Sequence, residues 1–326
     1  MTIVLVTGGK GYIGSHLVSL LSHRGYKVIS IDCEYFIDNN KQNESDENGV
    51  IYSKCDIRIK EDLNKWVEKA DIIIHLAGIV GEPACSYDKD LSYQVNVIGT
   101  KNLLDLSIKH NIKRFIFASS CSVYGFGNEV FDENSKLNPI GYYASQKIEA
   151  ENMIIQNSEN IEYSILRFST LFGCSKRMRF DLALNIMTAN GTVEKNVNVF
   201  GGTQERPFIH CYDVARAIIK ILESEISNEI INVGDNNLNY NFMELGKLIA
   251  DKTMANLSIN NIKEDNRSYF VSFNKIRNKL GFKASVSIED GITEIMNYIN
   301  ENDVDIKNKR FNNLLTLKTI MEEEKC

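Results

Sequence analysis

Tyr143 and Lys147 are four residues apart in a stretch with helical periodicity, which predicts that they share one face of a helix. A tyrosine with a pKa of about 10 is a poor base at neutral pH. A neighbouring ammonium group favours the phenolate, so Tyr143 could accept a hydroxyl proton while a hydride leaves the same carbon. Because the chain has 14 tyrosines, this pair indicates that chemistry only together with the motifs upstream.

Two serines, Ser119 and Ser120, follow the apolar run Arg114–Ala118, which has the composition of a buried strand. A serine hydroxyl at the end of that strand could hydrogen-bond the reacting oxygen beside the tyrosine. The spacing alone does not decide between the two serines.

A glycine-rich loop lies between the first predicted strand and the first predicted helix. Its glycines Gly8, Gly11 and Gly14 are spaced three apart. Glycines permit a tight turn and let the backbone approach a pyrophosphate, and the helix N-terminus supplies amide donors. The strand–turn–helix context is the one that a dinucleotide-binding loop requires.

Further candidate cofactor residues fall at the ends of the next predicted strands. Asp32 ends the second strand, where a carboxylate can accept both ribose hydroxyls of adenosine and would repel a 2′-phosphate. The sequence therefore predicts NAD rather than NADP. Asp56-Ile57 and the segment His75–Gly78 follow the third and fourth strands, and small residues there would let a dinucleotide lie against the backbone.

Apolar runs alternate with amphipathic stretches in the first half of the chain, which predicts an α/β fold with a doubly wound parallel sheet of the Rossmann type. After about residue 173 the predicted elements become short, which indicates a smaller C-terminal α/β lobe that covers the sheet edge. We expect a cofactor domain over 1–172, a substrate-binding lobe over 173–302 that is interleaved with it, and a charged tail over 303–326 that frays or docks on a partner chain. The strands are expected at Ile3–Val6, Lys27–Ile31, Val50–Ser53, Ile72–His75, Arg114–Ala118, Tyr163–Arg167, Asn198–Phe200 and Glu229–Val233. The helices are expected at Ile13–His23, Lys60–Lys69, Asp90–His110, Tyr142–Gln156, Phe180–Ala189, Asp213–Glu223, Asn241–Asp251 and Ile288–Asn300.

The composition argues against several other classes of protein. The net charge of -6 comes from 43 acidic and 37 basic residues that are mixed along the chain, so we expect no nucleic-acid partner. No apolar run is long enough to span a bilayer and no signal peptide is evident, which predicts a cytoplasmic protein without a membrane partner. The seven cysteines show no paired metal-type spacing, so we expect buried thiols and no metal.

The motifs together resemble those of the extended short-chain dehydrogenase/reductase family, in its nucleotide-sugar epimerase/dehydratase group. The matches run in order from residue 3 to about residue 300. They are carried by the glycine loop, Asp32, Asp56-Ile57, His75–Gly78, Asn96–Thr100, Ser120 with Tyr124-Gly125, Tyr143 with Lys147, Arg206–His210 with Asp213–Ala215, and Asn232–Gly234.

The resemblance implies roles for individual residues. Tyr143 would be the acid/base, Lys147 would bind the nicotinamide ribose and lower the pKa of the tyrosine, and Ser120 would be the catalytic serine. The residues implied to contact NAD are Gly8, Gly11, Tyr12, Ile13, Gly14, Asp32, Asp56, Ile57, Leu76, Ala77, Gly78, Asn96, Tyr143 and Lys147. Arg206 and Arg267 would meet the diphosphate of a nucleotide-sugar substrate, because a guanidinium group suits phosphate, and Ser122 would also contact the substrate.

The resemblance also narrows the reaction. Family dehydratases carry an Asp-Glu pair after the catalytic serine, whereas this chain has Cys121 and Ser122, so we expect no dehydration. Some family epimerases use a cysteine near this place, but Ser122 matches that position, and we expect Cys121 to be a buried, inert thiol. We expect an NAD-dependent 4-epimerase, with a 4-dehydrogenase or a 4-keto-sugar reductase as alternatives. A non-catalytic dinucleotide sensor is a minor alternative, since the serine, tyrosine and lysine are all present.

Two stretches, Gly81–Cys85 and Arg177–Leu182, depart from the common UDP-galactose epimerase pattern. They resemble a bacterial subgroup associated with surface-polysaccharide gene clusters, some of whose members are sugar 4-dehydrogenases. Many relatives dimerise through two helices that form a four-helix bundle, so the resemblance implies a homodimer through Asp90–His110 and Tyr142–Gln156.

Overall fold

The computed structural model describes residues 1–36, 49–260 and 268–323. Its centre is a seven-stranded, wholly parallel sheet with the order β11-β7-β5-β4-β1-β2-β3. These strands are β1 (Ile3–Thr7), β2 (Lys27–Asp32), β3 (Val50–Lys54), β4 (Ile72–His75), β5 (Arg114–Ser120), β7 (Glu162–Phe168) and β11 (Glu229–Val233). The predicted doubly wound parallel sheet is confirmed.

The order of the strands places a switch point beside β1. The chain begins in the middle of the sheet, proceeds to β2 and β3 at one edge, and then returns to β4 on the other side of β1. Ligands of such sheets bind outside the carboxyl ends of the strands where the order reverses. The glycine loop after β1 and the loop after β4 therefore flank the expected binding crevice.

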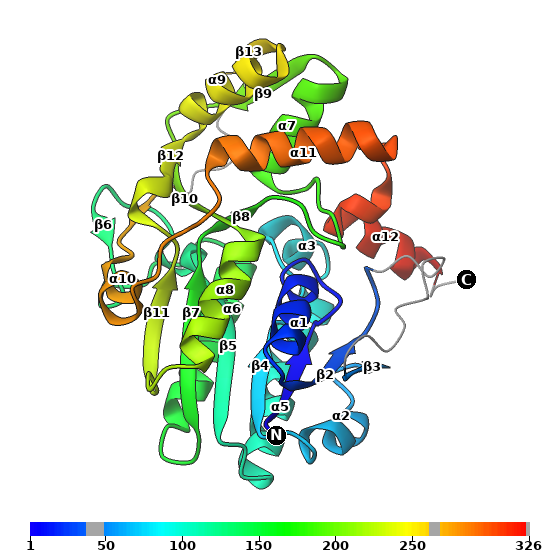
Figure 1. Cartoon of the computed structure of the whole chain (residues 1–326), viewed down its shortest axis with the longest axis vertical. Helices are drawn as coiled ribbons and strands as arrows, with labels where there is room; N and C mark the ends of the chain where they lie inside the picture. The colour runs from blue at the N-terminus through cyan, green and yellow to red at the C-terminus, as the bar shows by residue number, and fades with distance from the viewer. Residues whose placement is uncertain (37–48, 261–267, 324–326) are drawn as a thin grey trace.

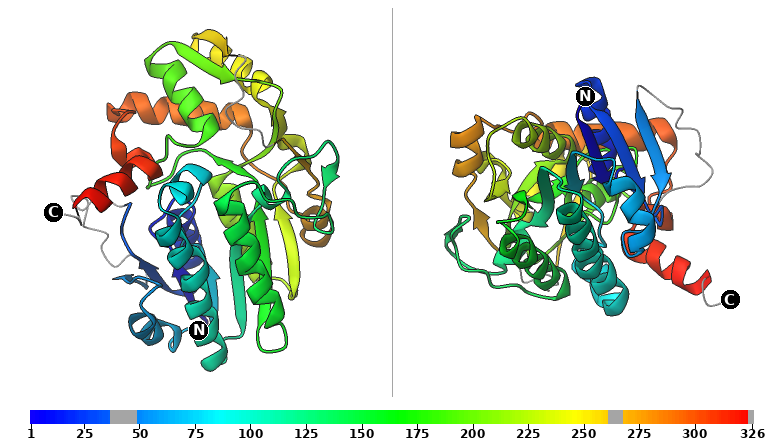
Figure 2. Two further views of the ribbon diagram at one scale, coloured as in Figure 1. Left: turned by 180° about the vertical axis from the view of Figure 1, so that it is seen from behind. Right: turned by 90° about the horizontal axis from the view of Figure 1, so that it is seen from below.

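Helices cover both faces of the sheet. α1 (Gly14–His23) and α8 (Cys211–Leu222) pack against one face, in front of the sheet in Figure 1. The other face is covered by α2 (Lys60–Val67), α5 (Thr100–Lys109) and α6 (Tyr142–Gln156), of which α5 and α6 lie in front in the left view of Figure 2. The central strands are apolar throughout because both of their faces are buried.

A smaller lobe lies above the carboxyl ends of the strands (Figure 1). It contains α7 (Ala183–Val193), α9 (Phe242–Thr253) and α11 (Ile288–Asn302), and a parallel pair formed by β9 (Asn196–Phe200) and β13 (Asn256–Asn260). Its apolar side chains form a core of their own. The polypeptide between the two cores includes β8 (Thr170–Phe172) and β10 (Glu205–His210), which pair with each other in parallel.

One segment of the second half lies in the large sheet and not in the smaller lobe. Sequence reasoning assigned the elements near residues 213–233 to the lobe, but β11 pairs with β7 as an edge strand and α8 packs against α1. A strand of five residues has no local signal for the sheet that it joins, because its partner lies more than sixty residues earlier in the chain. The chain after residue 173 therefore contributes both to the large sheet and to the smaller lobe.

The described part of the tail packs on its own chain, which corrects the expectation that it frays, whereas docking on a partner chain stays a prediction. The described residues of the tail include α12 (Asn313–Glu323), which contacts the short helix α3 (Glu82–Tyr87). Phe311 stacks edge-on against Phe180 at 5.1 Å between ring centroids. The tail therefore packs on segments that border the sheet edge.

Candidate active site

The glycine loop fits closely against the loop after β4. Gly8 has a φ of +71°, and a Cβ atom there would lie 2.8 Å from the backbone nitrogen of Ala77. A Cβ atom at Gly14 would lie 2.1 Å from the carbonyl oxygen of Gly8. Side chains at these two positions would push the first turn of α1 off β1 and β4, so the sequence needs glycine there.

Tyr12 and Asp32 connect the glycine loop to neighbouring segments of the chain. The hydroxyl of Tyr12 donates to the carbonyl of Gly173 at 2.5 Å and accepts from the amide of Asn185, so this residue joins the loop to the chain leading into α7. The carboxylate of Asp32 accepts from the backbone nitrogens of Lys10 at 3.2 Å and Glu34 at 2.9 Å. Burial raises the pKa of Asp32, so further donors to this carboxylate would be stabilising.

The next pair of predicted cofactor residues is held by neighbouring side chains. Asp56 forms a bidentate ion pair with Arg58, at 3.0 Å from Nε and 2.5 Å from the terminal nitrogen. Ile57 is buried and packs where a Cβ atom at Gly99 would lie, 2.7 Å from its Cδ1. Ile13 and Leu76 are partly buried against the core of the α1 face, and Ala77 against the core of the opposite face.

His75 connects β1, β4 and the helix that follows. Thr100 donates its hydroxyl hydrogen to the carbonyl of Asn96 at 2.7 Å, so it accepts from Nε2 of His75 at 2.9 Å. Nδ1 of His75 is then the acceptor for the Thr7 hydroxyl at 2.7 Å. Burial lowers the pKa of His75 to about 3, which keeps the ring neutral. Its part in the site is structural.

Asn96 lies in a π-helical turn (Gln94–Gly99), a feature often found near functional sites. Its amide accepts from the backbone nitrogen of Ile79 and donates to the carbonyl of the same residue, both at 2.9 Å. It also donates to Gln146 on α6 at 2.8 Å. Asn96 therefore fixes the loop after β4 against α6, beside Gly78, and direct contact with NAD remains a prediction.

The three predicted catalytic side chains meet at the carboxyl end of β5. Ser120 ends β5, and its side chain lies close enough to the phenol of Tyr143 to lower the pKa of that group by hydrogen bonding. Tyr143 and Lys147 lie one turn apart on α6, with Lys147 Nζ 5.9 Å from the centroid of the tyrosine ring. The spacing alone did not decide between the serines, and the resemblance implied Ser120. The structure separates the two, since Ser119 donates to the buried Glu151.

Electrostatics at this centre favour a protonated tyrosine in the absence of ligands. Burial and the Cys85 thiol raise the pKa of Tyr143, while the hydrogen bond with Ser120 and the charge of Arg179 lower it. Lys147 is 5% exposed and donates to the carbonyl of Ala118 at 2.7 Å. Burial lowers the pKa of Lys147 to about 8. A further positive charge beside the phenol would favour its ionisation.

Arg179 is a site residue to which sequence reasoning gave no role. It is buried, and its guanidinium lies 5.9 Å from the ring centroid of Tyr12. Its positive charge lowers the pKa of Tyr143. Asp181 pairs with it in bidentate geometry at 2.9 and 3.0 Å. The sequence singled out only the Arg177–Leu182 block. The spacing within this block does not predict a contact with Tyr12, more than 160 positions earlier.

The predicted substrate residues lie in different surroundings. Arg206 on β10 is buried, lies 4.9 Å from the ring centroid of Tyr269, and donates to the carbonyl of Glu205. The buried hydroxyl of Ser122 has no hydrogen-bond partner among the described residues. Cys121 is fully buried and directs its thiol to the carbonyl of Arg167 at 3.3 Å, as expected for an inert thiol. Arg267 lies outside the described residues.

Comparison with known proteins identifies the family. Residues 4–234 match the model of the NAD dependent epimerase/dehydratase family. The chain belongs to this family. It is 30% identical over 313 residues to a protein of Methanocaldococcus jannaschii assigned as a UDP-glucose 4-epimerase, with 92% of this chain and 99% of the relative covered. It is also 26% identical over 319 residues to the UDP-N-acetyl-alpha-D-glucosaminuronate decarboxylase of Bacillus cytotoxicus, covering 91% and 97%.

A solved member of the family has the same architecture. The UDP-glucose 4-epimerase of Thermotoga maritima, solved with UDP-glucose, matches with a TM-score of 0.81 and 26% identity, covering 93% of this chain and 100% of that one. The epimerase/dehydratase family comprises NAD-dependent enzymes, which confirms the predictions of the family, of an enzyme and of NAD as its cofactor. No helix among the described residues is long and apolar enough to cross a membrane.

The residues at the switch point fit the NAD of the epimerase/dehydratase family. Gly8 and Gly14 leave no room for a Cβ atom, so the backbone alone forms the floor beneath the N-terminus of α1. The half-buried carboxylate of Asp32 has a raised pKa, which donation from ribose hydroxyls would counteract. These residues would hold the pyrophosphate and the adenosine respectively.

Replacement of Asp32 by asparagine should weaken NAD binding by about 10- to 100-fold, because a charged acceptor is exchanged for a neutral one. The preference for NAD over NADP should fall as well, since the charge that repels a 2′-phosphate is gone. Isothermal titration calorimetry with both dinucleotides measures this. Glu34→Gln is the control, because Glu34 already pairs with Lys10 at 2.6 Å. Unchanged affinity for both dinucleotides in Asp32→Asn would contradict the assignment of Asp32 to the adenosine ribose.

Proposed function

We propose that this protein is an NAD-dependent nucleotide-sugar 4-epimerase that acts on a nucleoside-diphosphate hexose. The observation that carries the proposal is the grouping of Ser120 with Tyr143, whose pKa it lowers, and with the buried Lys147 one helical turn along α6. This group lies at the carboxyl ends of β4 and β5, next to the glycine loop. A hydroxyl-bearing carbon placed there would face both a base and the cofactor crevice.

The chain's own residues account for the proton that must move. Tyr143 accepts the proton of the C4 hydroxyl, and Ser120 hydrogen-bonds the same oxygen and keeps it in line with the phenol. Lys147 contributes positive charge one turn along the helix, and Arg179 contributes a second positive charge. Bound NAD supplies the hydride acceptor and, when oxidised, a positive charge beside the phenol. After the 4-keto sugar has rotated, the hydride would return to the opposite face of C4, and Tyr143 returns the proton to the C4 oxygen.

The residues after Ser120 favour this outcome over dehydration. Elimination of water would need a carboxyl pair beside the catalytic serine, whereas the short 3₁₀ helix Cys121–Tyr124 carries none. The thiol of Cys121 is turned to a backbone carbonyl, and burial raises its pKa. The buried hydroxyl of Ser122 has no hydrogen-bond partner among the described residues, so it could hydrogen-bond a hydroxyl of the substrate.

The substrate assignment follows the chemistry of the site and the names of the relatives. A buried arginine on β10, Arg206, is suited to a diphosphate, and the relatives named above act on UDP-sugars. The resemblance of Gly81–Cys85 and Arg177–Leu182 to a surface-polysaccharide subgroup supports a role in surface polysaccharide biosynthesis. A cytoplasmic location stays a prediction.

The test is to incubate the purified protein and NAD with UDP-, GDP-, CDP- and dTDP-sugars while recording absorbance at 340 nm, with products analysed by mass spectrometry and NMR. A flat trace with an isomer of unchanged mass supports the 4-epimerase. Accumulating absorbance with a product two mass units lighter would identify a 4-dehydrogenase, and loss of carbon dioxide would identify a decarboxylase. Conversion only of 4-keto sugars would identify a reductase, and cofactor binding without turnover of any sugar would favour a sensor.

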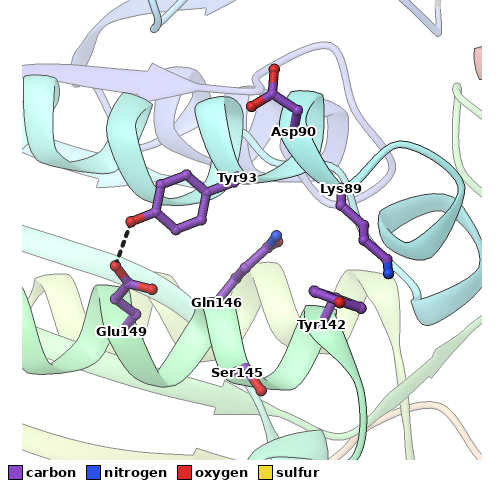
Figure 3. A pocket seen from close by; sticks show the side chains of 7 residues that line it. All are labelled: Lys89, Asp90, Tyr93, Tyr142, Ser145, Gln146 and Glu149. Carbon is purple, nitrogen blue, oxygen red and sulfur yellow. Dashed lines mark hydrogen bonds between the residues drawn. The ribbon is translucent and has the colours of Figure 1, made fainter.

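We also propose a homodimer through the outer face of α6 and of α4 (Lys89–Tyr93), the helix that leads into α5. A hollow lies between these helices, and Figure 3 shows the side chains that line it. Two aromatic side chains are exposed there, Tyr93 at 38% and Tyr142 at 43%. Tyr93 donates to Glu149 across the hollow at 2.8 Å. The hollow combines these tyrosines with the charged side chains of Lys89, Asp90 and Glu149. Exposed aromatic side chains among polar ones are typical of an interface.

Light scattering after size-exclusion chromatography should give twice the mass of the chain at micromolar concentration. Ser145→Arg would place a large charged group in the lining of the hollow and should yield a monomer. Asn300→Arg, at the exposed end of α11 in the smaller lobe, is the matched control and should stay dimeric. A monomeric mass for the unaltered protein would overturn the proposed dimer without bearing on the reaction.

A further inference from the structure

Helix α6, which carries Tyr143 and Lys147, has no capping side chain of its own. The residue before its first turn is Gly141, whose φ of 91° and ψ of 178° lie outside the helical region. The first backbone N–H groups of a helix have no partner within the helix. A serine, threonine, aspartate or asparagine normally caps them from the residue before the helix.

The cap of α6 comes from a different helix. Glu82 is the first residue of α3, and its Oε1 accepts from the backbone nitrogen of Tyr142 at 2.9 Å. Its Oε2 accepts from the backbone nitrogen of Tyr143 at 3.1 Å. Both oxygens of one carboxylate therefore hold the first turn of α6, sixty residues later in the chain.

Gly141 leaves room for this contact, and Ser86 supports it. A Cβ atom at Gly141 would lie between 2.2 and 2.5 Å from the three carboxyl atoms of Glu82, so glycine leaves the room that the carboxylate occupies. The hydroxyl of Ser86, one turn along α3, donates to Oε1 of Glu82 at 2.6 Å. Glu82 is thus fixed to α3 on one side and to α6 on the other.

The contact bears on Tyr143 through the backbone. Tyr143 is the second residue of α6, so the first turn of the helix sets where its phenol lies. The groups that face the phenol come from other elements: Ser120 from β5, Arg179 from the chain before α7, Cys85 from α3 and Tyr269 from the segment after residue 267, with Lys147 on α6 itself. Glu82 does not contact the phenol, since both of its oxygens accept from the backbone of α6, so its charge acts on Tyr143 only from the end of the helix.

We propose that Glu82 is a positioning residue for Tyr143, which caps α6 from α3 and so holds the phenol beside Ser120. Its negative charge also offsets part of the positive end of the helix dipole at Tyr143. The proposal rests on the proposed role of Tyr143 as the acid/base. It gives a function to the Gly81–Cys85 stretch, which the cofactor and substrate assignments leave unused.

Three variants separate the two effects of the carboxylate. Glu82→Gln keeps the length but replaces one acceptor by an amide group that faces a backbone donor, and it removes the charge. Glu82→Asp keeps the charge but shortens the reach. Gly141→Ala leaves Glu82 in the sequence and displaces its carboxylate with a methyl group. The readouts are kcat, KM, NAD affinity and the pH profile of kcat, measured on the holoenzyme with the sugar that it converts.

We expect kcat to fall by about 10- to 100-fold in all three variants, because a small displacement of an acid/base is costly, while KM and NAD affinity change less than twofold. In Glu82→Gln the acid limb of the profile should move to lower pH, since the phenolate loses a repelling charge. In Glu82→Asp the limb should stay in place. Unchanged kcat in both Glu82 variants, or equal losses of kcat and NAD affinity, would overturn the proposal.

The controls test the site and the reaction separately. Ser86→Ala removes a contact of Glu82 but neither cap hydrogen bond, and Glu61→Gln removes a carboxylate from the first turn of α2, away from the site. Both should keep kcat within about twofold of the unaltered protein. If Tyr143→Phe retains full activity, the reaction proposal fails. If Tyr143→Phe is inactive while Glu82→Gln is fully active, the positioning proposal alone fails.

Discussion

Replacement of Tyr143 by phenylalanine should lower kcat by about 100- to 10,000-fold and leave NAD affinity nearly unchanged. The change removes one oxygen atom and keeps the ring, which packs against Ile79, Ala84 and Cys85. Ser120 then no longer has a phenol hydroxyl beside it. The neighbouring Cys85 directs its thiol to the carbonyl of Ile79 at 3.3 Å, so we do not expect it to recover the loss.

The adjacent Tyr142 provides a matched control for this variant. It lies one position earlier on α6, is 43% exposed, and faces the outer hollow (Figure 3). Tyr142→Phe should therefore keep full activity. Single-turnover and steady-state assays of both variants, with circular dichroism to verify folding, make the comparison. Full activity in Tyr143→Phe would refute the mechanism, and a loss in Tyr142→Phe of equal size would show that the acid/base had been assigned to the wrong residue.

The local part of this site could be predicted from the sequence. Helix α6 spans Tyr142–Gln156 and strand β4 spans Ile72–His75, both as expected from periodicity and apolar composition. The glycine loop was predicted for the same reason, because the motif and its strand–turn–helix context lie within one continuous segment, residues 3–23. Such signals depend only on residues close together in the sequence, so periodicity and motif spacing predict them.

The contacts that tune the site could not be predicted, because they join residues far apart in the sequence. Glu82 meets the start of α6 across sixty residues, and Arg179 meets Tyr12 across more than 160. No periodicity encodes either contact, since each depends on how α3 or the chain before α7 packs. The same reason explains why the place of β11 in the large sheet escaped prediction.

Glu151→Gln should destabilise the folded protein by about 3–5 kcal/mol, because it leaves the buried charge of Arg167 without a counter-charge. Glu151 and Arg167 are 1% and 2% exposed, and they are joined by hydrogen bonds of 3.0 and 2.6 Å. Arg167 also donates to the hydroxyl of Tyr124 at 3.0 Å. The pair joins α6 to β7 directly beneath the catalytic group, so its loss is expected to loosen the helix that carries Tyr143.

The same substitution should alter the pH dependence of activity. Burial lowers the pKa of Lys147 to about 8, and the charge of Glu151, one turn along α6, opposes that effect. A neutral glutamine withdraws this support, so the pKa of Lys147 should fall further. Lys147 then loses its proton at a lower pH than in the unaltered protein, and the alkaline limb of the kcat profile should move to lower pH. A limb that moved to higher pH would contradict this account.

Urea denaturation of a matched set of variants decides whether the effect belongs to the buried pair. The control is Glu223→Gln, which breaks an exposed pair with Arg24 and should cost less than about 1 kcal/mol. A double variant, Glu151→Leu with Arg167→Met, should recover much of the loss, because two apolar side chains replace two charges that must otherwise be paired. A loss below about 1 kcal/mol in Glu151→Gln would mean that Tyr124 and the surrounding backbone suffice to hold Arg167. The pair would then serve the charge state of Lys147 and not the stability of the fold.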